Sequence, residues 1–129
     1  MPRFAYVNGQ YVPHRDASVH IEDRGFQFAD SVYEVIACMN GYLADEQGHL
    51  DRLERSLKEL RMEMPMTRGA MKLVIREFIR RNKLKNASVY MQVTRGTAPR
   101  DFKFPDAPDY TFVMTVYPAN YNLEKRKAM

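Results

Sequence analysis

The sequence contains a single cysteine, Cys38, among its 129 residues. One thiol cannot form a disulfide within the chain, and this favours a reducing compartment such as the cytoplasm. No apolar run approaches the roughly 20 residues of a membrane-spanning helix, and the first residues, Met-Pro-Arg-Phe-Ala-Tyr, lack the apolar core of a signal peptide. These absences predict a cytoplasmic protein with no membrane partner, in which Cys38 is a small buried residue of a strand.

Signatures of metal, nucleotide and nucleophile sites are also missing. The histidines at positions 14, 20 and 49 have no metal-ligand spacing with one another or with Cys38. There is no Gly-x-Ser-x-Gly elbow, no Walker loop and no Gly-x-Gly-x-x-Gly turn. We therefore predict no metal site, and a bound phosphate would have to be held by arginine and backbone groups.

The charge of the chain is moderate, with a net value of +4. Its basic clusters, residues 80–85 and 125–127, are not interleaved with stacking aromatic residues, which argues against nucleic-acid binding. The first cluster resembles the cationic C-terminal end of a helix, which the helix dipole favours. The positive balance suits small anionic ligands such as phosphates and carboxylates.

Turn and helix signals divide the first half of the chain. Asn-Gly pairs at residues 8–9 and 40–41 predict two hairpins with type I′ turns, the second of which joins a strand over 31–39 to a shorter partner. Leucines at positions 50, 53, 57 and 60 then recur at helical spacing. We expect this first helix to be capped by Asp45 and to end before Pro65.

The second half predicts one more helix and two strands. Thr67 is a suitable cap for a helix that ends near Asn82, and apolar residues predict strands over 88–95 and 110–117. The fold class is therefore α+β, a mostly antiparallel sheet with two helices, in a small domain over residues 1–118. Residues 119–129 are polar and unpatterned, typical of the start of a linker to a domain that this chain lacks.

Residues 20–36 contain more polar and aromatic groups than a core requires. In the charged turn at 22–25 we expect Gly25 to adopt a positive φ, before a polar-aromatic elbow and a strand that carries Tyr33. Tyr33, Arg52 and Arg100 are candidate binding residues. Each also has a structural explanation: a core tyrosine with a satisfied hydroxyl, an arginine paired with Glu46 or Glu59 of its own helix, or a solvated loop arginine.

Several motifs together resemble one family. Asp-Arg-Gly at 23–25, the pair Phe28 and Asp30, and Val-Tyr-Glu-Val at 32–35 resemble the N-terminal signature of the class IV (fold type IV) pyridoxal-phosphate aminotransferases. His-Leu-Asp-Arg-Leu at 49–53 resembles the family's first helix. The loop at 92–105 is similar to that of the D-amino acid aminotransferases. Branched-chain aminotransferases and aminodeoxychorismate lyases share the earlier features but do not usually carry this Pro-Arg loop.

The resemblance implies roles for particular residues. Arg52 matches the residue that contacts the phosphate of pyridoxal 5′-phosphate, and a guanidinium suits that task. Tyr33 and Arg100 match residues that hold the substrate carboxylate, with Arg100 reaching across the interface of a homodimer, while Val35 borders the substrate pocket. Phe102 stands where the family often has a histidine that shares this carboxylate, so affinity or substrate range is expected to differ.

The resemblance also implies that catalysis needs more than this chain. The Schiff-base lysine and the glutamate that pairs with the cofactor's pyridine nitrogen lie on a second domain of the family, which would begin just past residue 129. None of the lysines here occupies an apolar pocket that would make it nucleophilic: Lys58, Lys72, Lys83, Lys85, Lys103, Lys125 and Lys127.

We therefore expect the chain to contain no catalytic residue and to be inactive alone. It would be the N-terminal domain of an enzyme that transfers an amino group from a D-amino acid to a 2-oxo acid. The alternatives are a branched-chain aminotransferase or an aminodeoxychorismate lyase of the same fold. A third is a non-catalytic binding module.

Overall fold

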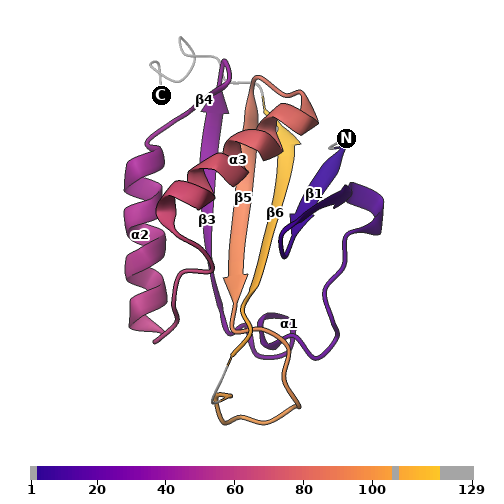
Figure 1. Ribbon diagram of the computed structural model, residues 1–129, viewed down its shortest axis with the longest axis vertical. Helices are drawn as coiled ribbons and strands as arrows, with labels where there is room; N and C mark the ends of the chain where they lie inside the picture. Colours follow the sequence, from indigo (N-terminus) through magenta and orange to yellow (C-terminus); the bar gives the residue numbers. More distant parts are fainter. Residues whose placement is uncertain (1–2, 106–107, 120–129) are drawn as a thin grey trace.

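The protein forms one six-stranded sheet with its long helices on a single face (Figure 1). A computed structural model describes residues 3–105 and 108–119. The sheet order is β2-β1-β6-β5-β3-β4, and every pairing is antiparallel. The strands are β1 (Phe4–Val7), β2 (Gln10–Pro13), β3 (Ser31–Met39), β4 (Tyr42–Leu43), β5 (Ala87–Thr94) and β6 (Thr111–Pro118). The predicted α+β class with a mostly antiparallel sheet is confirmed.

Both predicted hairpins are present, and their turns have the expected backbone. Asn8 and Gly9 have φ angles of 48° and 91°, and Asn40 and Gly41 have 53° and 83°. Positive φ at both central residues matches the right-handed twist of the flanking strands, which is why Asn-Gly is favoured there. The first turn joins β1 to β2 and the second joins β3 to the short edge strand β4.

The two predicted helices, α2 (Glu46–Glu59) and α3 (Arg68–Asn82), begin at the predicted caps. The Asp45 side chain accepts a hydrogen bond from the backbone N–H of Gly48, and Thr67 accepts one from that of Ala70. Each bond satisfies one of the unpaired N–H groups of a first helical turn. Leu60, expected on the buried stripe of the first helix, instead lies just past its end and is 38% exposed.

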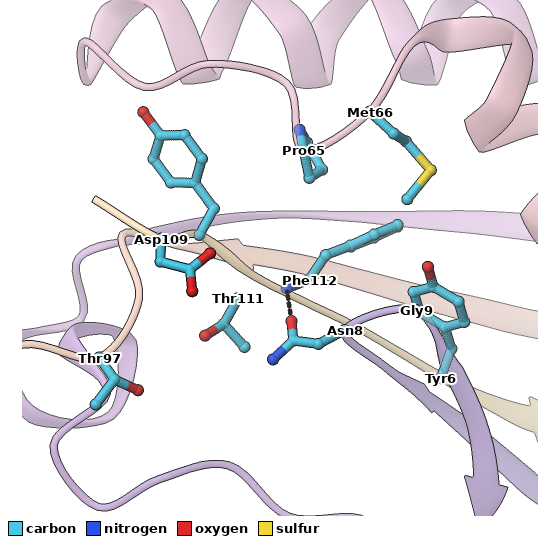
Figure 2. A pocket seen from close by; sticks show the side chains of 10 residues that line it. Tyr6, Asn8, Gly9, Pro65, Met66, Thr97, Asp109, Thr111 and Phe112 are labelled. Atoms are coloured by element: carbon cyan, nitrogen blue, oxygen red, sulfur yellow. Dashed lines mark hydrogen bonds between the residues drawn. The ribbon is translucent and has the colours of Figure 1, made fainter. Parts of the chain in front are cut away.

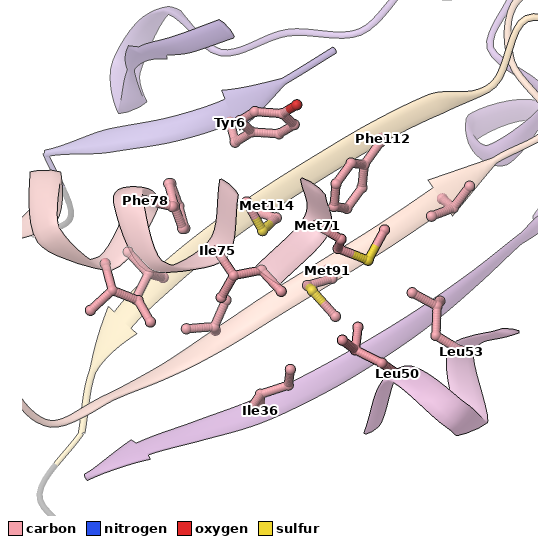
Figure 3. Close-up of a cluster of buried hydrophobic side chains, with 14 of the residues drawn as sticks. Tyr6, Ile36, Leu50, Leu53, Met71, Ile75, Phe78, Met91, Phe112 and Met114 are labelled. Carbon is pink, nitrogen blue, oxygen red and sulfur yellow. The ribbon is translucent and has the colours of Figure 1, made fainter. Parts of the chain in front are cut away.

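The core fills the space between the sheet and these helices (Figure 3). Alternate residues of the central strands point toward the helices, because side chains of a strand alternate between faces. The fully buried side chains come from β3, β5, β6, α2 and α3, and the larger ones include Ile36, Leu50, Leu53, Met71, Ile75, Phe78, Met91 and Met114. Burying each such side chain contributes roughly 1.5–3 kcal/mol. Cys38 lies in this core, as predicted.

A third helix, α1 (Arg24–Phe28), replaces the expected turn and elbow, and the prediction of a positive φ at Gly25 is wrong. Gly25 is helical, and its backbone N–H donates to Oδ1 of the capping residue Asp23 at 2.8 Å. A glycine is needed there for space, because a Cβ would overlap the side chain of Thr94 on β5. The positive φ lies four residues later, where Ala29 ends the helix at 54°.

The face of the sheet opposite α2 and α3 carries no α-helix within the described residues, and β3 is nearly an edge strand (Figure 1). On its outer side β3 pairs with β4 only through Cys38 and Met39. The stretch from Ser31 onward therefore presents a free edge beside α2 and an open face behind it. These two surfaces hold most of the predicted site residues.

Candidate functional site

Tyr33 and Val35 lie side by side on the open face of β3. They occupy alternate positions of the strand, and Tyr33 is 72% exposed. The interpretation of Tyr33 as a satisfied core tyrosine is therefore wrong. Tyr33 lines a shallow cavity of about 200 Å³ whose other walls come from Tyr90, Met91, Gln92, Val113 and Thr115. This part of the sheet can accept a small, partly apolar group.

Arg52 lies on the opposite side of β3, where it is held by a glutamate. Glu34 is 6% exposed, and its carboxylate accepts hydrogen bonds from Nε and Nη2 of Arg52 at 3.0 and 2.9 Å. The two groups face each other as a fork, which fixes the plane of the guanidinium. The alternative explanation of Arg52, a pairing with Glu46 or Glu59 of its own helix, is therefore wrong, because its partner Glu34 belongs to β3.

His49, one turn before Arg52 on α2, completes this cluster. Its Nδ1 is 2.7 Å from Oε1 of Glu34, so Nδ1 carries the proton that the carboxylate accepts. Burial opposes ionisation of Glu34, but the hydrogen bonds from Arg52 and His49 outweigh it and hold the pKa of the carboxyl below its ordinary value. Glu34 therefore stays charged and keeps the Arg52 guanidinium, which is 54% exposed, at the edge of the sheet.

Arg100 lies elsewhere, on the exposed loop between β5 and β6. Its Cζ is 5.9 Å from the centroid of the Phe28 ring, and the Phe102 ring is 5.4 Å from the same ring. Within the described residues, no hydrogen bond, ion pair or ring contact joins Arg100 to Tyr33 or to Arg52. The fold thus brings Tyr33 and Val35 together and places Arg52 beside the same strand, but it does not bring Arg100 to them.

Sequence reasoning missed a buried ion cluster at the base of this loop. Arg24 of α1 and Arg95, which follows β5, both donate to Oδ2 of Asp30, at 2.9 and 2.7 Å. Asp-Arg-Gly at 23–25 predicts a turn, and charged turn residues are usually solvated. The available signal was the opposite charge of Arg24, Asp30 and Arg95, which lie near the ends of two predicted strands. These strands, β3 and β5, pair in the sheet.

A separate cavity of about 480 Å³ contains none of the predicted site residues (Figure 2). It lies between the β1–β2 turn, the α2–α3 connection and the start of β6. Its walls are Tyr6, Asn8, Gly9, Pro65, Met66, Thr97, Asp109, Tyr110, Thr111 and Phe112. The side-chain oxygen of Asn8 is already used, since it accepts from the backbone N–H of Phe112 at 2.8 Å.

Residues 3–105 and 108–119 lack the features of two other kinds of site. No group of three or more His, Cys, Asp or Glu side chains in this part of the chain could hold a metal ion. None of the helices described there combines the length and the apolar character that crossing a membrane requires.

Comparison with known proteins assigns this fold and these residues to a family. Residues 31–129, about three quarters of the chain, match the profile described as amino-transferase class IV. The chain belongs to the class IV aminotransferases. The match includes β3 with Tyr33, Glu34 and Val35, α2 with Arg52, and the loop with Arg100.

Class IV relatives agree in sequence and in fold. The chain is 33% identical over 117 residues to a D-alanine aminotransferase of Staphylococcus haemolyticus, covering 91% of this chain and 41% of that protein. A branched-chain amino acid aminotransferase from Escherichia coli superposes with a TM-score of 0.85 at 22% identity, covering 92% of this chain and 42% of that one. A 4-amino-4-deoxychorismate lyase from Pseudomonas aeruginosa gives 0.74 at 22%, with coverages of 94% and 42%. The structural matches show the shared fold. The chain spans about two fifths of the length of these relatives.

The lysines that the structure describes lie away from the core of this class IV chain. The five within the described residues are exposed or half-buried: Lys58, Lys72, Lys83, Lys85 and Lys103. Lys125 and Lys127 lie outside the described residues, as do residues 120–129 of the predicted linker.

Proposed function

We propose that this chain is the N-terminal part of a pyridoxal-phosphate-dependent aminotransferase that transfers an amino group from a D-amino acid to a 2-oxo acid. The observation that carries the proposal is the pairing of Arg52 with the buried Glu34 at the free edge of β3. Support for the D-amino acid comes from the relative named D-alanine aminotransferase, which is 33% identical over 91% of this chain.

The geometry of Arg52 fits the phosphate of pyridoxal 5′-phosphate. Glu34 occupies Nε and Nη2 of the guanidinium, while Nη1 makes no hydrogen bond within the described residues. The group is half-exposed and its orientation is fixed, so Nη1 can donate to an anionic oxygen with little loss of side-chain entropy. We infer that Arg52 holds the phosphate. The cofactor, when bound, supplies the electron sink for the transfer.

Tyr33, Val35 and Arg100 would then contact the amino acid and 2-oxo acid substrates. Tyr33 offers a hydroxyl and Val35 an apolar wall on the same face of β3. Among the described residues, no hydrogen bond, ion pair or ring contact joins Arg100 to Tyr33 or Val35, and its exposed position suits a role in a second copy of the enzyme. We infer that the enzyme is a homodimer in which this loop reaches the partner's substrate carboxylate, and that it acts in the cytoplasm.

We assign no catalytic residue to this chain, and we place the lysine that binds the cofactor covalently outside it. The five described lysines lie on helices, turns or the loop, and none of them is buried in the apolar pocket that a nucleophilic amine requires. On this assignment, catalysis requires polypeptide from the second domain of the family.

The proposal is tested on the product of the complete reading frame that encodes this chain. We expect an absorption band between about 300 and 500 nm and amino transfer from D-alanine to 2-oxoglutarate, with little transfer from L-alanine. Arg52→Met should release the cofactor on dialysis, and Arg100→Ala should raise KM for the donor with the cofactor retained.

Other outcomes would favour the alternatives. Preference for branched-chain L-amino acids would indicate a branched-chain aminotransferase, and elimination without amino transfer would indicate a lyase. Absence of both band and activity would leave a binding module.

A further inference from the structure

We propose that Arg24 is a positioning residue whose buried guanidinium fixes the course of loop 96–105 and, through it, the place of Arg100. The part of this inference that concerns substrate rests on the proposed function, in which Arg100 binds a carboxylate. The anchoring of the loop rests only on contacts within this chain, and it can be measured without any enzymatic activity.

Arg24 belongs to a buried cluster in which two guanidinium groups share one carboxylate. Its Nε and that of Arg95 both donate to Oδ2 of Asp30, and the three side chains are 3%, 4% and 8% exposed. In these ion pairs one carboxylate therefore faces two guanidinium groups, whose other N–H groups need further acceptors. A buried charge of this kind is costly unless further acceptors surround it.

Loop 96–105 supplies the further acceptors of Arg24, whereas Nη2 of Arg95 donates to the carbonyl oxygen of Leu60 at 2.7 Å. Nη1 of Arg24 donates to the carbonyl oxygen of Asp101 at 2.6 Å and lies 3.4 Å from that of Lys103. The centroid of the Phe104 ring is 5.5 Å from Cζ of Arg24 and 3.9 Å from Cζ of Arg95. Charged hydrogen bonds and cation–π contacts both strengthen where water is excluded. The loop thus folds onto the guanidinium of Arg24 and supplies the acceptors that this buried charge needs.

The base and the tip of the loop are held differently. At the base, the backbone N–H of Arg24 donates to the carbonyl of Gly96 at 2.8 Å, and Asp23 pairs with Thr97 in an isolated β-bridge. These backbone bonds do not require the arginine side chain. At residues 101–104 the hydrogen bonds to α1 come from the guanidinium, and Phe28 of α1 adds only a ring contact with Phe102. Loss of the Arg24 side chain should therefore loosen the tip and leave the base in place.

Arg100 immediately precedes Asp101, whose carbonyl accepts from Arg24, and both arginines lie near the same aromatic ring, that of Phe28. The Phe28 ring lies 4.8 Å from Cζ of Arg24 and 5.9 Å from Cζ of Arg100. A lysine at position 24 could not reproduce this arrangement, because a single ammonium lacks the planar fork that spans Asp30 and Asp101 together. The position of Arg100 consequently depends on the guanidinium of Arg24.

Trypsin cleavage of the purified 129-residue chain after Arg100 and Lys103 tests the anchoring. Arg24→Met removes the loop contacts but leaves Asp30 balanced by Arg95, so the domain should still fold. We expect these two bonds to be cut about tenfold faster in Arg24→Met, because a charged hydrogen bond that closes the loop is lost. Arg24→Lys should give an intermediate rate.

The matched control is Arg68→Met. Arg68 also spans a carboxylate and a carbonyl, those of Asp51 and Gln47, but it joins α3 to α2. Its loss should leave the cleavage rate of the loop unchanged. An unchanged loop rate in Arg24→Met would overturn the proposal. So would an equal acceleration at sites throughout the sheet, since that would show global destabilisation and no local anchor.

In the complete enzyme, a double-mutant cycle tests the link to Arg100. Arg24→Met should raise KM for the amino donor several-fold, with kcat and the cofactor absorption band little changed, and it should add nothing in an Arg100→Ala background. Additive effects would show that Arg24 does not act through Arg100. If the wild-type enzyme transfers no amino group, the proposed function fails while the trypsin result still decides the anchoring.

Discussion

Ala29 ends α1 with a backbone that alanine seldom adopts. Its φ of 54° and ψ of 30° are left-handed, a conformation that costs L-residues roughly 1–2 kcal/mol. Ala29→Gly would remove this cost, although the greater freedom of glycine in the unfolded chain offsets part of the gain. We expect the free energy of unfolding to rise by about 0.5–1 kcal/mol, measured by urea denaturation.

The control for this variant is Ala70→Gly within α3, which should destabilise the protein. A loss of stability in both variants would contradict the argument about Ala29.

The lowered pKa of Glu34 predicts that the free energy of unfolding depends on pH. Because this pKa is lowered in the folded state, the carboxylate contributes fully to the free energy of unfolding above the ordinary glutamate pKa, about 4.3. That contribution is lost as pH falls through the folded pKa. Glu34→Gln should cost about 1 kcal/mol at pH 7, a modest figure because Arg52 is half-exposed.

Unfolding free energies of wild type and Glu34→Gln, compared from pH 7 to pH 3, check this prediction. The difference between the two proteins should shrink below about pH 4.3 as the wild-type carboxyl becomes protonated. Glu63→Gln, at an exposed position, serves as the control and should show almost no difference at any pH. A difference that stayed constant to pH 3 would mean that the charge of Glu34 is unimportant.

At the scale of elements, the start of α3 depends on one hydroxyl. Thr67 Oγ1 accepts from the backbone N–H of Ala70 at 3.2 Å, and the helix that follows packs Met71, Ile75 and Phe78 into the core. Thr67→Ala should lower the free energy of unfolding by about 1 kcal/mol, whereas Thr67→Ser should lower it far less. Thermal denaturation followed by circular dichroism measures both, and equal losses would indicate that the methyl group of threonine matters more than its hydroxyl.

Elements with local signals were predicted from the sequence, and those defined by distant contacts were not. The strand over 31–39 was predicted at both ends, because an Asn-Gly turn fixes one end and β-branched residues mark its length. By contrast, α1 has five residues, too few for a helical period, and it contains a glycine. The short helix was therefore missed.

The site divides in the same way. Tyr33 and Val35 share a face by strand alternation, which sequence alone predicts. The partner of Arg52 is 18 residues away on another element, and the pairing depends on where α2 packs against β3. The burial of Arg24 and Arg95 likewise arises only when α1 and the end of β5 meet at Asp30. Local sequence patterns do not show which elements pack against each other.

At the scale of the whole molecule, the long helices α2 and α3 cover one face of the sheet, and no described helix covers the other. Across the open face, Tyr33, Tyr90 and Tyr117 are 72%, 43% and 45% exposed on three neighbouring strands, and the rings of Tyr90 and Tyr117 lie 5.6 Å apart. An aromatic surface of this kind favours burial against protein. We expect the 129-residue chain to self-associate through this face, with an average mass that rises with concentration in sedimentation velocity experiments.

Two variants that introduce a lysine test whether the chain associates through this face or through another part of its surface. Tyr90→Lys places an ammonium in the middle of the open face, where its desolvation would oppose association, and should shift the chain toward monomer. Leu73→Lys makes a similar change on α3, where Leu73 is 68% exposed on the other side of the molecule, and should leave association unchanged. If Leu73→Lys were the variant that dissociates the chain, the helical layer would be the contact surface. If wild type stayed monomeric at every concentration, the open face would be stable in water without a partner.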